Sequence, residues 1–154
     1  MNGLAGLRRA TAADLDAVTA LQREAYAKNR PILGGEPLPL LADYAQVLGD
    51  YEVWLLEGPD GLDAVLILEP RADDLLLWSI ATTPHAQGHG VGNRLLAATE
   101  ARARELGRDR VRLYTGDKLA DRIAWYQRHG YRHERTEALD DRSIVHLVKL
   151  LDPV

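Results

Sequence analysis

Three glycines within five positions stand directly before an apolar helical pattern in the middle of this chain. They are Gly88, Gly90 and Gly92, in the stretch PHAQGHGVGNRLL at residues 84–96. Glycine costs roughly 0.5–1 kcal/mol relative to alanine inside a regular element. Free backbone amides at a helix N-terminus, together with the helix dipole, make a site for an anion such as a phosphate. Two interpretations follow: an anion-binding turn, which we favour, and a tight strand-to-helix turn that binds nothing.

Two familiar phosphate-binding patterns do not match this turn. A P-loop requires G-x-x-x-x-G-K-[ST], and no Lys-Ser or Lys-Thr follows the glycines. A dinucleotide fingerprint requires G-x-G-x-x-G, and Asn93 stands where its last glycine should be. The turn also follows the third or fourth expected strand rather than the first. A dinucleotide-binding oxidoreductase is therefore the least favoured hypothesis.

The composition limits the class of protein. A chain of 154 residues suits one domain, 1–154, with its own core. A net charge of −4 argues against a nucleic-acid partner. The chain has no cysteine, which excludes disulfides, thiolate metal sites and cysteine nucleophiles. His85 and His89 are four residues apart but straddle the glycine turn, so we expect no metal site.

The sequence also bears on location. No apolar run approaches the roughly 20 residues that a membrane span needs. The first residues lack the apolar centre of a signal peptide. We therefore expect a cytoplasmic protein with no membrane partner.

Periodicity and turn residues predict alternating strands and helices. The predicted strands span 6–10, 52–58, 63–69, 75–82, 110–116, 131–138 and 143–151. The predicted helices span 11–29, 40–49, 91–106 and 118–130, with a Pro/Gly-rich loop at 30–39. Short turns within 52–82 favour antiparallel hairpins, whereas the strand-helix-strand crossover at 75–116 requires parallel pairing. The fold class is a mixed α+β or α/β domain.

Two motifs in this order of elements resemble those of the GNAT superfamily of N-acetyltransferases. Q-x-x-G-x-G at residues 87–92 looks like the pyrophosphate loop of that family. The preceding IATTP resembles the end of its fourth strand, and IAWYQRHGY at 123–131 resembles its Y-x-x-x-G-F/Y signature. The order of elements is similar across nearly the whole chain. The resemblance implies a central mixed, mostly antiparallel sheet of about seven strands flanked by four helices.

The resemblance also implies acetyl-CoA, or another acyl-CoA, as the donor. Backbone amides of the glycine turn would hold its pyrophosphate, and the end of the fourth strand would offer backbone groups to the pantetheine arm. The residues implied to bind the donor are Ile80, Ala81, Thr82, Gln87, Gly88, His89, Gly90, Val91, Gly92 and Asn93.

The resemblance assigns a catalytic role to one side chain. Spacing alone places Tyr126 in the core, continuing a stripe that begins at Leu119 and Ile123. In the family, a tyrosine at the matching position lies near the CoA sulfur and protonates the departing thiolate. We therefore expect Tyr126 to be the catalytic acid. A backbone N–H near Ala81 or Thr82 is the expected oxyanion donor.

A general base has no clear candidate. Many relatives have a carboxylate on the fourth strand where this chain has Trp78 and Ser79. Three acidic residues lie nearby at strand ends and are better explained as solvated turn residues: Glu69, Asp73 and Asp74. The Asn that the family often has before the tyrosine also lacks an equivalent, since Leu119 and Arg122 stand in that region.

The resulting hypothesis is an N-acetyltransferase that moves an acetyl group from acetyl-CoA to a primary amine of a small molecule or peptide, directly through a tetrahedral intermediate. The acceptor pocket is expected near the first two helices, their loop and the strand after residue 140, with Tyr26, Glu36 and Tyr44 as candidates to meet a cationic amine. The alternative is a non-catalytic acyl-CoA-binding or sensor module, suggested by the missing carboxylate. A homodimer is common in the family.

Overall fold

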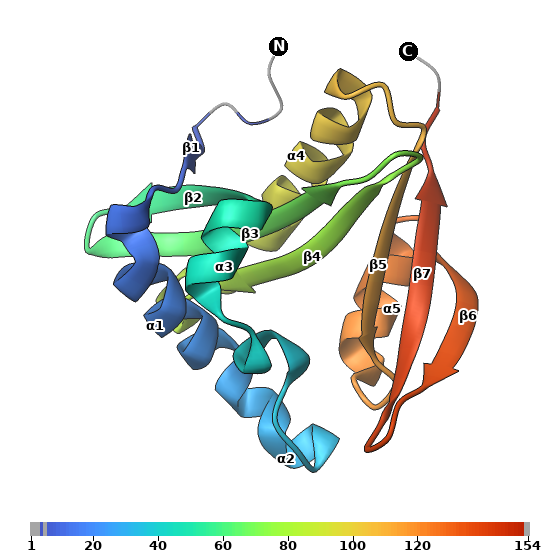
Figure 1. Ribbon diagram of the computed structural model, residues 1–154. Helices are drawn as coiled ribbons and strands as arrows, with labels where there is room; N and C mark the ends of the chain where they lie inside the picture. Colours follow the sequence, from blue (N-terminus) through green and yellow to red (C-terminus); the bar gives the residue numbers. More distant parts are fainter. Residues whose placement is uncertain (1–3, 5, 153–154) are drawn as a thin grey trace.

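The fold is built on one seven-stranded sheet, as a computed structural model that describes residues 4 and 6–152 shows (Figure 1). Its strands, in the order β1-β2-β3-β4-β5-β7-β6, pair antiparallel except for β4 with β5. The strands are β1 Arg8–Arg9, β2 Glu52–Gly58, β3 Gly61–Pro70, β4 Leu75–Thr82, β5 Arg110–Gly116, β6 Arg132–Ala138 and β7 Ser143–Leu150. The predicted mixed, mostly antiparallel sheet is confirmed.

Helices cover both faces of the sheet. They are α1 Leu15–Tyr26, α2 Arg30–Leu33, α3 Tyr44–Asp50, α4 Val91–Glu105 and α5 Ala120–Arg128. The pair α1 and α3 lies on one face, and α4 and α5 lie on the other (Figure 1). The four predicted helices correspond to α1, α3, α4 and α5. Among the described residues, no helix combines the length and apolar character needed to cross a bilayer.

Several boundaries differ from the prediction for local reasons. The first strand is only Arg8–Arg9, which pairs with β2. The loop predicted at 30–39 contains the single turn α2, and the 3-10 turn Leu38–Leu41 overlaps its end. The helix predicted at 40–49 starts later because Asp43 caps α3 by accepting the N–H of Ala45 at 3.0 Å.

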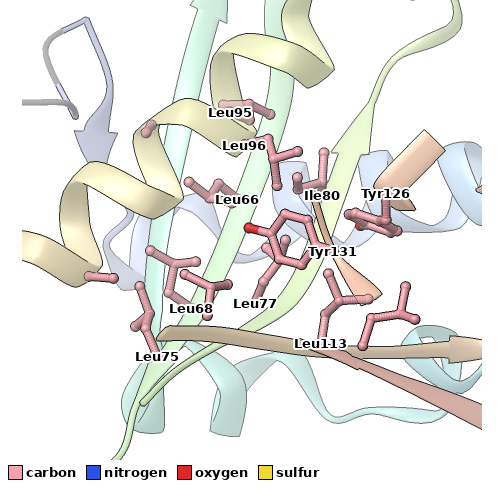
Figure 2. Packing of buried hydrophobic residues seen from close by; sticks show 14 of the residues in the cluster. Leu66, Leu68, Leu75, Leu77, Ile80, Leu95, Leu96, Leu113, Tyr126 and Tyr131 are labelled. Carbon is pink, nitrogen blue, oxygen red and sulfur yellow. The ribbon is translucent and has the colours of Figure 1, made fainter. Parts of the chain in front are cut away.

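Two apolar clusters form the core, one on each face. The first joins α4 and α5 to the sheet through residues such as Leu66, Leu95 and Tyr126. Figure 2 shows Tyr126 and Tyr131 packed beside Leu113 within this cluster. The second cluster joins α1 and α3 to the opposite face. Each helix is therefore fixed by the apolar stripe that the sequence predicts.

The centre of the sheet opens into a V. The parallel pairing of β4 and β5 covers only Leu75 with Val111 and Leu76 with Arg112. Beyond these pairs the two strands diverge (Figure 1). The pairing of β4 with β3 also shifts register, because Ile67 faces Ser79 while Leu68 faces Leu77. The residue between them on β4, Trp78, is therefore the extra residue of a β-bulge, which bends the strand next to the V.

Candidate active site

The glycine turn between β4 and α4 uses its glycines in two different ways. Gly88 and Gly90 have φ of +83° and +78°, a left-handed conformation that favours glycine. Gly92 lies in the first turn of α4, where a Cβ would come within 3.4 Å of the Trp125 ring. The N-cap residue of α4 is Gly90, which has no side chain to accept a hydrogen bond from the first turn of the helix. Within the described residues, the first N–H groups of α4 are therefore available to donate to a ligand. The turn therefore combines the backbone shape and the positive helix end that an anion site requires.

Two side chains hold this turn in place. Gln87 Nε2 donates to the backbone carbonyl of Thr82 at 3.1 Å, which ties the turn back to the end of β4. Trp125 Nε1 donates to Asn93 Oδ1 at 3.2 Å, which ties the first turn of α4 to α5. Gln87 and Asn93 thus act here as positioning residues of the turn. Trp125 lines the groove beside the turn.

A groove of about 970 Å³ runs past the turn, between the end of α1, the end of β4 and the start of α5. It brings together nine of the ten residues expected to bind the donor; His89 is exposed and does not line it. Lys28, Lys118 and Arg122 also line this groove. Their positive charges complement the phosphates of a nucleotide donor.

The end of β4 presents backbone groups to the groove on alternate residues. The carbonyl of Ile80 accepts from Arg122 Nη2 at 2.9 Å, and the carbonyl of Thr82 accepts from Gln87. Both donors reach β4 from its open side. Because successive residues of a strand direct their backbone groups to opposite neighbours, the groups of Ala81 face β3. Of the residues expected to contact pantetheine, Ile80 and Thr82 therefore have backbone groups at the open edge of β4. The oxyanion N–H was expected near Ala81 or Thr82, and of these two only Thr82 directs its N–H to the open edge.

A second compartment fills the V between β4 and β5. This cavity of about 60 Å³ is lined by β4, β5, α5, the end of α1 and residues between α2 and α3. Most of its lining is apolar or aromatic. Its charged lining residues are Arg122 and Arg142, and among the described residues no carboxylate lines it. Four residues line both the cavity and the groove: Tyr26, Asn29, Leu119 and Arg122.

A buried polar network supports the cavity wall on the α1 side. Ser79 Oγ lies 2.7 Å from Tyr26 Oη and accepts from Gln22 Nε2 at 3.1 Å. Gln22 Nε2 also donates to Tyr44 Oη, which donates to the carbonyl of Pro39. Gln22 Oε1 has no hydrogen-bond partner within the part of the chain that the structure describes. Ser79, which with Trp78 stands where the family resemblance implies a carboxylate, is thus tied into a neutral network.

Tyr126 lies on the wall that separates the cavity from the core cluster. It is 3% exposed and lines the cavity but not the groove. Burial raises the pKa of the Tyr126 phenol, and the nearby Arg122 only partly offsets that rise. The phenol is therefore protonated at neutral pH, which is the state required of a proton donor.

Arg122 is the site residue that sequence reasoning missed. Its guanidinium carbon lies 5.7 Å from the ring centre of Tyr26 and 5.9 Å from that of Tyr126, so it is held between two aromatic rings. Its bond to the Ile80 carbonyl spans the open side of β4. The signal was present in the spacing, because Arg122 precedes Tyr126 by four residues and shares the inward face of α5.

The acidic residues considered as bases lie outside both compartments. Asp74 is buried, but Arg71 Nε donates to it at 2.6 Å and Arg112 Nη1 at 2.8 Å. Burial acts to raise the pKa of Asp74, yet these two hydrogen bonds lower it on balance. Glu69 and Asp73 do not line the cavity or the groove. Asp74 is thus a structural ion-pair partner. Among the described residues, Asp121 is a carboxylate that lines the groove, and no carboxylate lines the cavity.

The three residues expected to meet the acceptor separate in the structure. Tyr26 lines both compartments. Tyr44 is buried in the polar network and does not line the cavity. Glu36 pairs with Arg30 at 2.7 Å and does not line it either, although its backbone carbonyl accepts from Arg142. The arrangement favours an acceptor site with positive rather than negative charge.

The histidines are dispersed. His85 lies 3.1 Å from Asp63, and His146 lies 2.8 Å from Glu137 on neighbouring strands. Within residues 4 and 6–152, no group of three or more His, Cys, Asp or Glu side chains is placed to hold a metal ion.

Sequence comparison identifies one family for this chain. A model of the family described as "Acetyltransferase (GNAT) domain" matches residues 49–133, which is more than half of the chain. The matched region contains the glycine turn and Tyr126. Among curated proteins, no sequence matches the chain.

Solved structures share the fold at low sequence identity. The ribosomal-protein-S18-alanine N-acetyltransferase from Escherichia coli has a TM-score of 0.75 at 18% identity, with 96% of this chain and 94% of that chain covered. A GNAT family acetyltransferase from Elizabethkingia anophelis, with acetyl-CoA bound, has a TM-score of 0.70 at 17% identity, covering 94% and 97%. An N-acetyltransferase from Thermoplasma acidophilum, in complex with coenzyme A, has a TM-score of 0.75 at 16% identity, covering 94% and 97%.

Proposed function

The chain belongs to the GNAT acetyltransferase family, and we propose that it transfers an acetyl group from acetyl-CoA to a primary amine of a small molecule or peptide. The observation that carries this proposal is the junction of two compartments. The groove contains the glycine turn and the open edge of β4, and the cavity contains Tyr126. They meet at Tyr26, Asn29, Leu119 and Arg122. A donor in the groove and an acceptor in the cavity would meet there.

In this proposal the groove binds acetyl-CoA. The free N–H groups at the start of α4 receive the pyrophosphate, with Lys28 and Lys118 adding positive charge. The pantetheine arm follows the edge of β4 at Ile80 and Thr82. Two solved structures of the same fold, with acetyl-CoA and with coenzyme A, support this choice of donor.

Acetyl-CoA supplies an activated acyl carbon, and the chain's own groups handle the charges that develop. The amine nitrogen attacks the thioester carbonyl, and the N–H of Thr82 stabilises the oxyanion of the tetrahedral intermediate. No carboxylate lines the cavity among the described residues, so an ammonium loses its proton to solvent before the amine attacks. The nitrogen loses a second proton to solvent as the amide forms. When the C–S bond breaks, Tyr126 gives its proton to the sulfur and later recovers one from solvent.

The lack of a carboxylate on the cavity wall also favours a second candidate function. In that case the chain binds an acyl-CoA without transferring its acyl group and acts as a sensor or as part of an assembly. Both candidates predict the same groove and the same donor affinity. Turnover with an amine separates them.

The first experiment is calorimetric titration of the protein with acetyl-CoA, with CoA and NAD titrated in parallel. We expect micromolar binding of acetyl-CoA and no binding of NAD. Release of free thiol in the presence of a panel of amines then tests transfer. Binding of NAD without binding of CoA would overturn the proposal. Donor binding with no thiol release above the rate without amine would favour the second candidate.

A further inference from the structure

Two arginines, Arg122 and Arg142, give the cavity positive charge, and among the described residues no carboxylate lines it. Arg142 is bound to Asp141 at 2.8 Å and to the carbonyl of Glu36 at 2.6 Å, so its charge is paired. Arg122 is different, because within the described part of the chain no carboxylate lies within ion-pair distance of it. Its described hydrogen-bond partners are neutral: the carbonyl of Ile80 and the Tyr126 hydroxyl.

A guanidinium offers five N–H donors in a planar fork that matches a carboxylate. In Arg122, one described hydrogen bond uses Nη2, and two aromatic rings flank the group. A partly buried cation held this way has lost much of its water without gaining a counter-ion, which costs free energy. An anion entering the cavity would recover part of that cost. The charge therefore favours an anionic ligand over a cationic one.

The position of Arg122 limits how far this anion can lie from the reacting nitrogen. Arg122 belongs to the wall shared by the groove and the cavity, where the acyl carbon and the amine would meet. An anionic group bound to it lies within a few bonds of the amine. A carboxylate on the carbon that carries the amine satisfies this geometry. The N-terminus of a peptide does not, since its neighbouring carbonyl is an uncharged amide.

The size and lining of the cavity limit the rest of the acceptor. About 10–15 Å³ holds one water molecule, so 60 Å³ has space for about four or five non-hydrogen atoms. The walls beside Arg122 include Leu77, Leu113 and Ile144. A short apolar side chain fits this environment, and a second charge does not.

We propose that the acceptor is a free α-amino acid with a small apolar side chain, whose carboxylate binds Arg122. This inference rests on the proposed function and narrows it. A simpler role for Arg122 is that of a strut, which only holds α5 to the open edge of β4. The two roles differ in one measurable way. A strut affects all acceptors equally, whereas a carboxylate anchor affects acids more than their amides.

The test compares matched acceptors with saturating acetyl-CoA. Glycine and glycinamide form the first pair, L-alanine and L-alaninamide the second, and spermidine and a tri-alanine amide represent cationic and peptide amines. We expect kcat/KM to be at least about tenfold higher for each acid than for its amide. Arg122→Gln should lower that ratio about 10- to 100-fold, since a charged hydrogen bond is lost. Arg128→Gln removes an exposed charge from the same helix, away from both compartments, and should keep the wild-type ratio.

A binding measurement keeps the inference testable if turnover is absent. N-Acetyl-L-alanine and N-acetyl-L-alaninamide are titrated into the protein with CoA present, for the wild type and for Arg122→Gln. We expect the acid to bind at least about tenfold more tightly in the wild type, and the two ligands to bind alike in the variant. Arg122→Lys should restore part of the preference, as it keeps the charge but loses the planar fork.

Each outcome separates the inference from the proposed function. Acetylation of amides, spermidine or peptide as fast as the acids would overturn the inference and leave the proposed function standing. An equal loss for all acceptors in Arg122→Gln would show a strut and would also overturn it. Preferential binding of the N-acetyl acid with no turnover of any amine would support the anion site while overturning the transferase.

Discussion

The groove and the cavity lie on two sides of a shared wall, but they are built in different ways. Most of the groove's expected donor contacts come from one continuous stretch, residues 80–93, and from its backbone. The cavity is built from side chains of elements far apart in the chain, from Tyr26 in α1 to Arg142 before β7. Backbone recognition leaves a local signature of glycines in the sequence. Recognition by side chains depends on the tertiary fold. The proposed donor site is thus encoded by one local stretch of sequence, whereas the proposed acceptor site is not.

The largest expected effect separates chemistry from donor binding. Tyr126→Phe removes the phenol that would protonate the thiolate, so kcat should fall about 10²- to 10⁴-fold. The dissociation constant for acetyl-CoA should stay within about twofold, because Tyr126 does not line the groove. Steady-state kinetics and calorimetry measure the two quantities. Tyr131→Phe is the matched control, because Tyr131 is a buried tyrosine of the same cluster whose hydroxyl donates to Glu100. If both variants kept full kcat, Tyr126 would be a core residue only.

The next effect tests whether the backbone of the glycine turn recognises the donor. Gly90→Ala forces a side chain into a left-handed conformation, at about 1–2 kcal/mol, and shifts the amides that follow. We expect acetyl-CoA to bind about 5- to 30-fold more weakly, as measured by calorimetry. Gly107→Ala is the control, because Gly107 has φ +71° beyond the other end of α4 and space for a Cβ. It should lose similar stability and keep donor affinity. Equal losses of affinity would show that the turn has no special role.

The smallest effect concerns the closed end of the V, away from both ligands. Asp74→Asn weakens a contact with Arg71 inside the turn between β3 and β4, and a contact with Arg112 of β5 beside the short parallel pairing of β4 with β5. The free energy of unfolding at pH 7 should fall by about 1–3 kcal/mol, with little change in acetyl-CoA affinity. Chemical denaturation and calorimetry test these two expectations. A large loss of acetyl-CoA affinity would mean that the contacts at Asp74 also determine how far β4 and β5 separate at the groove.

The stability lost in Asp74→Asn should also depend on pH, because the pKa of Asp74 is lower in the folded protein than in the unfolded chain. The pKa of Asp74 is lowered below its usual 3.8 by the two arginines. Its stabilising contribution is therefore complete above about pH 5 and is lost as the pH falls through the lowered pKa. The difference in stability between wild type and Asp74→Asn should shrink from pH 5 to pH 3. A difference that stayed constant over that range would contradict the ion-pair role.

Much of the fold could be predicted because its signals are local. The strands 52–58, 75–82 and 110–116 are confirmed at their predicted bounds, since apolar patterns and flanking turns define them. The 30–41 region was less predictable. Pro37 precedes the 3-10 turn Leu38–Leu41, and the Asp43 side chain sets the start of α3 at Tyr44, so single residues decide where each short element begins. Nine of the ten residues expected to bind the donor line one groove and His89 does not, and their role in donor binding stays a prediction.

The cavity was less predictable because its parts meet only after folding. The bulge at Trp78 places Ser79 toward α1, where it joins Gln22 and Tyr26. A bulge adds one residue without a distinctive motif. Arg122 gains its significance from Tyr26, nearly one hundred residues earlier in the chain. In the sequence, only its position four residues before Tyr126, on the inward face of α5, indicated that this charged side chain faces the interior.

The wall shared by the groove and the cavity makes the two ligands dependent on each other. Arg122 donates to the carbonyl of Ile80, a residue of the groove, and Arg122 itself lines both compartments. A ligand that moves this side chain in one compartment changes the surface offered in the other. Heterotropic coupling of this kind is reciprocal, so the factor by which the donor changes acceptor affinity equals the factor by which the acceptor changes donor affinity. Calorimetry of each ligand in the presence of the other measures that factor, and a value of one would mean that the wall is rigid.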